Sequence, residues 1–235
     1  MGEGLVVRPL VYLHPAGGVR PTRVLEKLKP HQPVFPGFDG TPTVAGLNSR
    51  KALGKWVGEY IEREIGKPCD VMGCSFGGAV ALWLAIQRPE LVDHLVLECP
   101  AGLQTIDAKL RADPAEFRKA LFVHPEKALP VSKTKEVEAE NRRMLSHYGA
   151  EDGKDQDLLQ HLEAIKHRAL ILHGTEDRII GRESVQLLKS RLAKSFLVYV
   201  WDAAHNIEVD QPERMLELVE GFLERSEAFV VNRAG

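Results

Sequence analysis

The chain has 235 residues, with 31 lysines and arginines against 33 aspartates and glutamates, so its formal charge at pH 7 is −2. This length suits one large α/β domain with an insertion, and the balanced charge excludes the basic stripe of a nucleic-acid-binding protein. Residues 1–18 lack the pattern of a secretory signal and no stretch approaches the roughly 18 apolar residues of a membrane helix, so we expect a cytoplasmic protein whose partner is a small molecule, with no nucleic acid and no membrane.

The three cysteines, Cys69, Cys74 and Cys99, are odd in number and lack the spacing of metal ligands. This usage fits reduced thiols better than a disulfide framework. Because a free cysteine packs as a small apolar residue, all three are expected in the core.

Strand and helix patterns alternate along the first hundred residues. Strand composition is found in residues 5–14 (LVVRPLVYLH), 33–38 (PVFPGF), 69–74 (CDVMGC) and 93–99 (DHLVLEC). Helical periodicity separates them in residues 23–29, 50–66 and 79–90. The last of these helices is expected to stop at Pro89.

The same alternation returns after residue 162. Two more strands are predicted over residues 168–174 (RALILHG) and 196–202 (FLVYVWD). A final helix over 212–223 begins with Pro212, where a missing N–H does no harm. Continuously apolar strands are typical of a parallel sheet with helices on both faces, so the sequence predicts an α/β fold with a doubly wound, mostly parallel sheet.

Residues 101–162 interrupt this alternation. Amphipathic helical patterns cover 105–130 and 135–149, and no strand pattern lies between them. About 60 residues without a strand indicate a helical cap inserted into the sheet domain. The predicted division is therefore a core of residues 1–100 and 163–235 and a cap of residues 101–162; the alternative is a surface excursion that contacts no site.

Residues 73–77 (GCSFG) have the GxSxG pattern at the junction of a predicted strand and helix. The pattern alone is weak evidence, but a strand that turns directly into a helix needs glycines where side chains would clash. Such a turn exposes the Ser75 hydroxyl, and the Phe76 N–H lies at a helix N-terminus that favours a developing negative charge. We predict that Ser75 is a nucleophile and that Phe76 supplies half of an oxyanion hole; the alternative is a glycine-rich turn with an ordinary serine.

A serine nucleophile needs a base within hydrogen-bond reach and a residue that orients the base. Asp177 follows the strand predicted over 168–174, and His205 follows the last strand. Catalytic groups of open α/β sheets collect at the carboxyl ends of the strands, where Ser75, Asp177 and His205 are all expected. These three residues are the predicted catalytic triad.

Three other carboxylates compete with Asp177 for the role of triad acid. Glu98 ends the strand before the cap and is the second choice. Glu176 is the neighbour of Asp177 along the chain. Asp202 is only three residues from His205 and is expected to cap a turn.

The loop of residues 14–18 (HPAGG) follows the first strand and is the expected source of a second oxyanion donor. Pro15 has no N–H, so the N–H of Ala16 is the prediction and that of Gly17 the reserve. His14 is expected to hold the loop by hydrogen bonds. The alternative is a glycine turn without a role in catalysis.

The segments LHPAGG, GCSFGGAVAL, RPELVDHLVLECPAG, ILHGTEDRII and AAHNIEVDQPE together resemble the α/β-hydrolase superfamily, in particular its members with a helical cap. These include carboxylesterases and hydrolases that split carbon–carbon bonds in diketone-type ring-cleavage products. The resemblance implies the triad Ser75, Asp177 and His205 with an oxyanion hole of Ala16 and Phe76. The antiparallel pair that opens the family's sheet looks shortened here, and HPAGG also resembles thioesterases that act on carrier-bound acyl groups.

The predicted function is a serine hydrolase that cleaves a small ester-type or activated carbonyl substrate through an acyl-enzyme, with no metal or organic cofactor. The alternatives are an acyl thioesterase, a carbon–carbon bond hydrolase and a non-catalytic small-ligand receptor on the same fold. A serine at the turn excludes the aspartate-nucleophile chemistry of dehalogenases and epoxide hydrolases. Several apolar residues of the cap either line an acyl pocket or pack the cap's own interior, and both alternatives stay open. They are Phe117, Leu121, Phe122, Met144 and Tyr148.

Overall fold

The computed structural model describes residues 8–150, 153–226 and 229. Five parallel strands form one sheet in the order β1-β2-β3-β4-β5. They are β1 (Leu10–Leu13), β2 (Cys69–Cys74), β3 (Val92–Glu98), β4 (Arg168–Gly174) and β5 (Ser195–Val200). Residues 5–7 of the predicted first strand lie outside the described residues.

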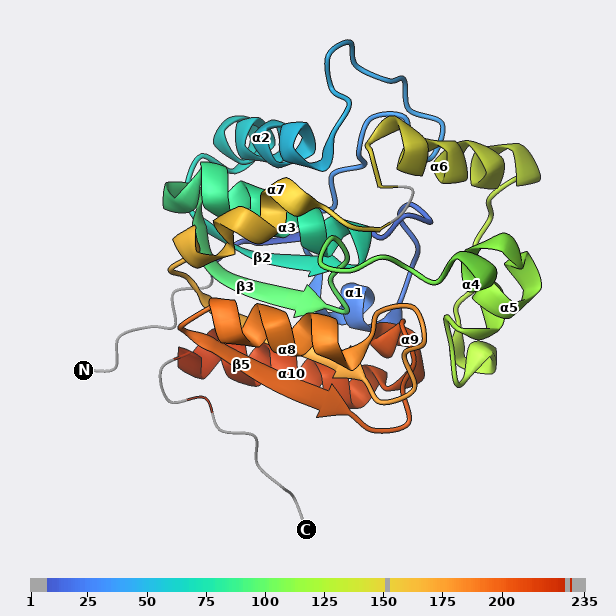
Figure 1. Ribbon diagram of the computed structural model, residues 1–235. Helices are drawn as coiled ribbons and strands as arrows, with labels where there is room; N and C mark the ends of the chain where they lie inside the picture. The colour runs from blue at the N-terminus through green and yellow to red at the C-terminus, as the bar shows by residue number, and fades with distance from the viewer. Residues whose placement is uncertain (1–7, 151–152, 227–228, 230–235) are drawn as a thin grey trace.

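Helices cover both faces of this sheet (Figure 1). Right-handed crossovers between strands taken in sequence order place their helices on one face. That face carries α2 (Arg50–Tyr60), α3 (Phe76–Gln87) and α8 (Arg182–Arg191), and the other carries α1 (Arg23–Leu28) and α10 (Pro212–Arg225). Because neither face meets water, strands can be apolar throughout, and every residue of β2 is buried. The predicted doubly wound, parallel α/β fold is confirmed.

The strand predicted over residues 33–38 is wrong. A single parallel bridge between His31 and Val11 joins this part of the chain to β1. Pro33 and Pro36 have no N–H to donate, so a ladder of hydrogen bonds cannot extend through the segment. Its two phenylalanines are nevertheless buried in the core, which explains the apolar pattern.

The other helices of the core region lie where the sequence pattern predicts them, but some of their ends and helix types differ. The helix predicted over 50–66 is α2 followed by a π-helical turn, Ile61–Ile65. α10 begins at Pro212 as expected. Short elements connect the longer ones: the 3₁₀ turns Pro89–Leu91, Pro125–Lys127 and Leu162–Ala164, and helix α9 (Ile207–Asp210).

Between β3 and β4, the described part of residues 101–162 contains helices and no strand. They are α4 (Ala108–Ala112), α5 (Pro114–Lys119), α6 (Lys135–His147) and α7 (Gln156–His161). The helical pattern of 105–130 is divided at Asp113, whose side chain accepts the N–H groups of Ala115 and Glu116 and so caps α5.

The helices α4, α5 and α6 lie beyond the carboxyl ends of the strands, whereas α7 runs beside α3 over the sheet (Figure 1). The indole Nε1–H of Trp83, on α3, donates to Asp155 Oδ2 at 2.9 Å, immediately before α7. Of the helices in residues 101–162, α4, α5 and α6 are therefore the ones that face the strand ends.

Within the ranges that the structure describes, no helix is both long and apolar enough to cross a bilayer. The three cysteines are buried and free of disulfide bonds, as their odd number predicted.

Candidate active site

Ser75 occupies the turn between β2 and α3. Its backbone has φ 51° and ψ −111°, a strained conformation for a residue with a side chain. Two backbone hydrogen bonds join the turn to the end of β3 and the residues that follow it. The Ser75 N–H donates to Glu98 O at 2.9 Å, and the Ser75 carbonyl accepts the Ala101 N–H at 3.0 Å. Ser75 is half-buried between buried neighbours, so part of this residue is accessible at the turn.

Gly73 and Gly77 allow three backbone segments to meet at this turn. A Cβ at Gly77 would lie 2.0 Å from Leu13 O, and a Cβ at Gly73 would lie 2.5 Å from Gly77 O. Both obstructing atoms belong to the backbone, so no side-chain movement relieves the clash. The steric reason for the glycines of the GxSxG pattern is confirmed, and the contact with Leu13 brings the HPAGG loop beside the start of α3.

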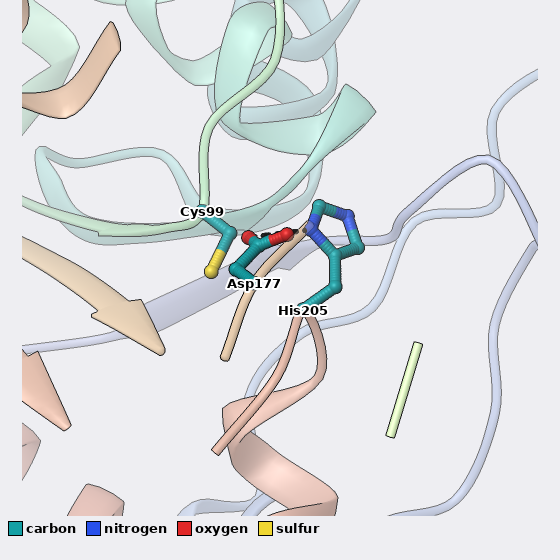
Figure 2. A group of neighbouring side chains, drawn as sticks. All are labelled: Cys99, Asp177 and His205. Carbon is teal, nitrogen blue, oxygen red and sulfur yellow. Dashed lines mark hydrogen bonds and ion pairs between the residues drawn. The ribbon is translucent and has the colours of Figure 1, made fainter. Parts of the chain in front are cut away.

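Asp177 and His205 are joined directly (Figure 2): His205 Nδ1 lies 2.9 Å from Asp177 Oδ2. The two side chains are almost fully buried, at 4% exposure for His205 and 0% for Asp177. A carboxylate only accepts hydrogen bonds, so Nδ1 carries the proton and Nε2 is free to act as a base. In Figure 2 this second ring nitrogen points away from Asp177.

The environment of Asp177 favours its ionised form. The second carboxylate oxygen, Oδ1, accepts the N–H groups of Ile179 at 2.8 Å and Ile180 at 3.0 Å. Burial opposes ionisation, but the charge and hydrogen bond of His205 and the two N–H donors outweigh it and hold the pKa of Asp177 below its ordinary value. An ionised carboxylate at this place orients the imidazole and stabilises its protonated form.

The loop of His205 is tied to the strand ends around Ser75. Glu208 N–H donates to Glu98 Oε1 at 3.1 Å, and the carbonyl of Glu98 holds the Ser75 N–H. A Cβ at Gly174 would lie 2.1 Å from Ala204 O, so the loop also presses on the end of β4. Ser75, Asp177 and His205 therefore lie at the same end of the sheet. Among the described residues the Ser75 hydroxyl has no hydrogen bond to the imidazole.

Cys99 completes the surroundings of the acid–imidazole pair and was missed in the sequence. Its Sγ, the Asp177 carboxylate and the His205 ring lie within 4.8 Å of one another. Thiol, carboxylate and imidazole are all metal-ligand types, but burial raises the pKa of the Cys99 thiol and N–H donors already satisfy Asp177. The three side chains therefore fit a hydrogen-bonded group better than a metal centre. The position of Cys99 directly after β3 was the feature of the sequence that could have indicated its place beside the pair.

Glu98, the second candidate for the acid, faces a different group. Its carboxylate, the Cys74 thiol and the Glu208 carboxylate lie within 4.8 Å of one another. Burial, followed by the charge of Glu208, raises the pKa of Glu98 to about 8, and Glu98 Oε2 has no hydrogen-bond partner. These surroundings favour the protonated form of Glu98, and no hydrogen bond joins it to His205 among the described residues.

The two other competing carboxylates also lie elsewhere. Asp202 has φ 56°, the left-handed conformation of a turn, and its Oδ2 accepts a hydrogen bond from His124 Nε2 at 2.7 Å. Glu176 is exposed. Asp177 is the only one of the four candidates that is bonded to His205 in the described chain.

The HPAGG loop lies beside the N-terminus of α3. The Gly18 N–H donates to Pro15 O at 3.0 Å and closes a turn. Within the described residues, neither the N–H of Ala16 nor that of Gly17 has an acceptor. Phe76 is the first residue of α3, where a backbone N–H has no intrahelical acceptor. The loop and the start of α3 therefore lie next to each other beside the Ser75 turn.

His14 holds the loop rather than the substrate. It is fully buried, its Nε2 accepts the Phe35 N–H at 3.1 Å, and its Nδ1 donates to Pro15 O at 2.8 Å. Burial lowers the pKa of His14 to about 4, so the ring is neutral and both nitrogens serve the loop.

The apolar cap residues divide into two sets. Met144 and Tyr148 are buried against the core, where the Tyr148 ring stacks on Phe38 at 6.1 Å and its hydroxyl donates to Pro36 O at 2.7 Å. These two side chains are packing residues. Phe117, Leu121 and Phe122 are half-buried and remain candidates to contact a substrate.

Known proteins resemble this chain over most of its length. A 2-hydroxymuconate semialdehyde hydrolase of Pseudomonas sp. (strain CF600) is 27% identical over 215 residues, covering 83% of this chain and 76% of that protein. A pimeloyl-[acyl-carrier protein] methyl ester esterase of Aeromonas hydrophila is 23% identical over an alignment of 251 residues, covering 91% and 94%.

A solved structure of similar fold is the meta-cleavage product hydrolase CumD of Pseudomonas fluorescens IP01, with a TM-score of 0.77 and 18% identity over 93% of this chain and 91% of that one. The named relatives are hydrolases and esterases, as the sequence motifs predicted. Residues 10–218 match the alpha/beta hydrolase family, and the chain therefore belongs to that family of enzymes.

Proposed function

We propose that this protein is a serine hydrolase that cleaves a small ester-type or activated carbonyl substrate through an acyl-enzyme. The observation that carries the proposal is the 2.9 Å bond between His205 and Asp177 at the sheet end that also holds the strained Ser75 turn. A cytoplasmic location, a small-molecule substrate and a cap over residues 101–162 belong to the same proposal.

In the proposed reaction the Ser75 hydroxyl attacks the substrate carbonyl while His205 Nε2 takes its proton. The oxyanion that forms accepts hydrogen bonds from the N–H groups of Phe76 and Ala16. As the carbonyl re-forms, the bond to the leaving group breaks and the imidazolium gives its proton to that group. Water then attacks the acyl-enzyme with His205 again as base; the bond between the acyl group and Ser75 Oγ breaks, and the imidazolium returns the proton to Ser75. Asp177 stays ionised throughout and holds the ring.

A carbon–carbon bond hydrolase of diketone-type substrates is the second candidate. The observation that favours it is the set of relatives named 2-hydroxymuconate semialdehyde hydrolase, at 27% and 29% identity. The esterase relatives favour cleavage of an ester, and the HPAGG loop favours cleavage of a thioester. The triad chemistry is shared by all three, so the substrate distinguishes them.

The test is a panel of p-nitrophenyl esters, acyl thioesters and a vinylogous diketone, assayed with the wild type, Ser75→Ala and Ser184→Ala. Ser184 is the matched control, because it is buried and its hydroxyl has no partner. We expect Ser75→Ala to lose about 10⁴-fold or more in kcat and Ser184→Ala to stay near the wild type. Turnover that survives in Ser75→Ala contradicts the proposal, and binding without any turnover supports the receptor alternative.

A further inference from the structure

Asn141 is a buried amide on a helix whose other residues are mostly exposed or half-buried. It is 2% exposed, and the only other buried residue of α6 is Met144. A buried amide is costly unless it is hydrogen-bonded. Asn141 makes three such bonds, all of them to residues outside the cap, so its burial serves a contact between the cap and the core.

One of these bonds and a hydrogen bond from Lys133 reach the loop that follows β1, and the same two side chains also bind Asp39. Asn141 Nδ2 donates to Gly17 O at 2.9 Å, and Lys133 Nζ donates to the same carbonyl at 2.8 Å. Asn141 Nδ2 also donates to Asp39 Oδ1 at 2.8 Å, which lies 2.7 Å from Lys133 Nζ. The Gly17 carbonyl is thus held by two donors from the cap.

Asp39 extends the same network to the next turn of the loop. Its Oδ2 accepts the Val19 N–H at 2.7 Å, and its own N–H donates to Asn141 Oδ1 at 2.8 Å. A Cβ at Gly18 would lie 2.2 Å from Asp39 Oδ1, so the loop packs directly on this carboxylate. Burial opposes the charge of Asp39, but Lys133, Asn141 and Val19 outweigh it and lower its pKa.

Gly17 and Gly18 can adopt many backbone conformations. The direction of the N–H groups of Ala16 and Gly17 therefore depends on the contacts that fix the neighbouring carbonyl groups. We propose that Asn141 is a positioning residue that, through Gly17 O and Asp39, aims the N–H groups of Ala16 and Gly17 at the oxyanion. The cap helix α6 thereby forms part of the support of the oxyanion hole. This inference rests on the proposed serine hydrolase function.

The test compares Asn141→Ala with His147→Ala. His147 lies on the same helix and makes a bond of the same kind, from Nε2 to Leu47 O at 2.9 Å, but away from the loop. Each variant loses one cap residue that bonds the core. We expect kcat on the best ester to fall about 10- to 100-fold in Asn141→Ala, with KM changed less than about twofold, and to stay near the wild type in His147→Ala.

The second readout is the affinity of a trifluoromethyl ketone, whose serine adduct carries an oxyanion. Its inhibition constant should rise by the same factor as kcat falls in Asn141→Ala and stay unchanged in His147→Ala. If Asn141→Ala does not fold, Lys133→Met removes the other donor to Gly17 O and should lower kcat by about three- to tenfold. If kcat and the inhibition constant in Asn141→Ala equal those in His147→Ala, the inference is overturned.

Failure of the inference is separable from failure of the proposed function. Ser75-dependent turnover that Asn141→Ala leaves intact refutes only the positioning role. Absence of Ser75-dependent turnover in the wild type refutes the hydrolase proposal, and the positioning role with it.

Discussion

Two buried groups at the carboxyl end of the sheet each contain a thiol and a carboxyl group, but the pKa of the carboxyl group shifts in opposite directions in the two. The Asp177 group consists of Cys99, Asp177 and His205, and the Glu98 group consists of Cys74, Glu98 and Glu208. Each joins a thiol to a carboxyl group within 4.8 Å. The pKa of Asp177 is lowered, whereas that of Glu98 is raised to about 8.

The difference follows from the donors that reach each carboxylate. Asp177 accepts two backbone N–H groups and an imidazole, so its charge is compensated despite full burial. Glu98 accepts one N–H at Oε1, and the nearest charge is a second carboxylate. Burial alone therefore does not decide protonation; hydrogen-bond donors and neighbouring charge do.

Glu208 takes the available positive charge in the Glu98 group. The Tyr12 hydroxyl donates to its Oε1 at 3.2 Å, and Arg20 Nε lies 3.6 Å from the same oxygen. Burial raises the pKa of both carboxyls, while Arg20 and the Tyr12 hydroxyl oppose this rise at Glu208. The surroundings of Asp177 therefore favour its ionised form beside His205, whereas those of Glu98 favour the protonated form.

The largest expected effect tests the Asp177 group by Asp177→Asn. An asparagine that donates to Nδ1 selects the wrong tautomer of His205, so we expect kcat to fall by about 10⁴-fold while the fold is kept. Steady-state kinetics on the best ester of the panel measure it, and Asp202→Asn serves as the control with unchanged kcat. A loss below tenfold in Asp177→Asn removes this carboxylate from the triad.

The next effect concerns stability and tests the Glu98 group by Glu98→Gln. A carboxyl whose pKa is raised by folding lowers the stability as pH rises from its ordinary value of about 4.5 to about 8, because the folded state retains the proton. Glutamine removes this dependence. The variant should be more stable than the wild type by on the order of 3 kcal/mol at pH 7, with little difference near pH 4.5.

Urea unfolding of the two proteins at pH 5, 7 and 8.5 measures this difference. The gain in unfolding free energy should grow with pH through this window and level off above pH 8. A difference that does not depend on pH would show that Glu98 is ionised in the folded protein.

A smaller effect separates the two groups by function. Tyr12→Phe removes the hydroxyl that donates to Glu208, which should cost about 1–2 kcal/mol of unfolding free energy because a bond to a buried carboxylate is lost. We expect kcat to change less than about twofold. Thermal unfolding and kinetics on the same preparation measure both quantities, and a tenfold loss of kcat would place the Glu98 group in the chemistry.

The smallest effect belongs to a hydrogen-bonded pair of side chains outside both groups. His124 and Asp202 are bonded at 2.7 Å, but their side chains are 27% and 45% exposed. Partly exposed pairs contribute little, so His124→Gln should change the unfolding free energy by less than about 1 kcal/mol. A loss comparable to that of Tyr12→Phe would mean that this bond holds the cap to the core.

The sequence predicts most of the sheet and of the serine turn because both depend on local patterns. The strands carry short apolar runs bounded by turn residues, and Gly73 and Gly77 are required by close backbone contacts at the turn. Residues 33–38 show the limit, since their apolar pattern reflects burial and two prolines prevent pairing. Asp177 was found because its position after β4 is a property of the chain order.

Other features depend on residues that meet only in three dimensions. Nothing in the sequence indicates that Glu98 lies against Cys74 and Glu208, or that this contact raises its pKa. Asn141 looks like one more polar residue of a charged helix until the loop of Gly17 and Asp39 is placed beside it. The Cys99 thiol lies next to Asp177 because the residues that follow β3 and β4 meet at the same end of the sheet.

The central claim is that Ser75, His205 and Asp177 work as one catalytic unit, and covalent labelling by a fluorophosphonate tests it most directly. Mass spectrometry of the labelled wild type should place one stoichiometric adduct on Ser75, and His205→Gln should slow its formation by at least about 10³-fold. An adduct on another residue, or a labelling rate that does not depend on His205, would contradict the account.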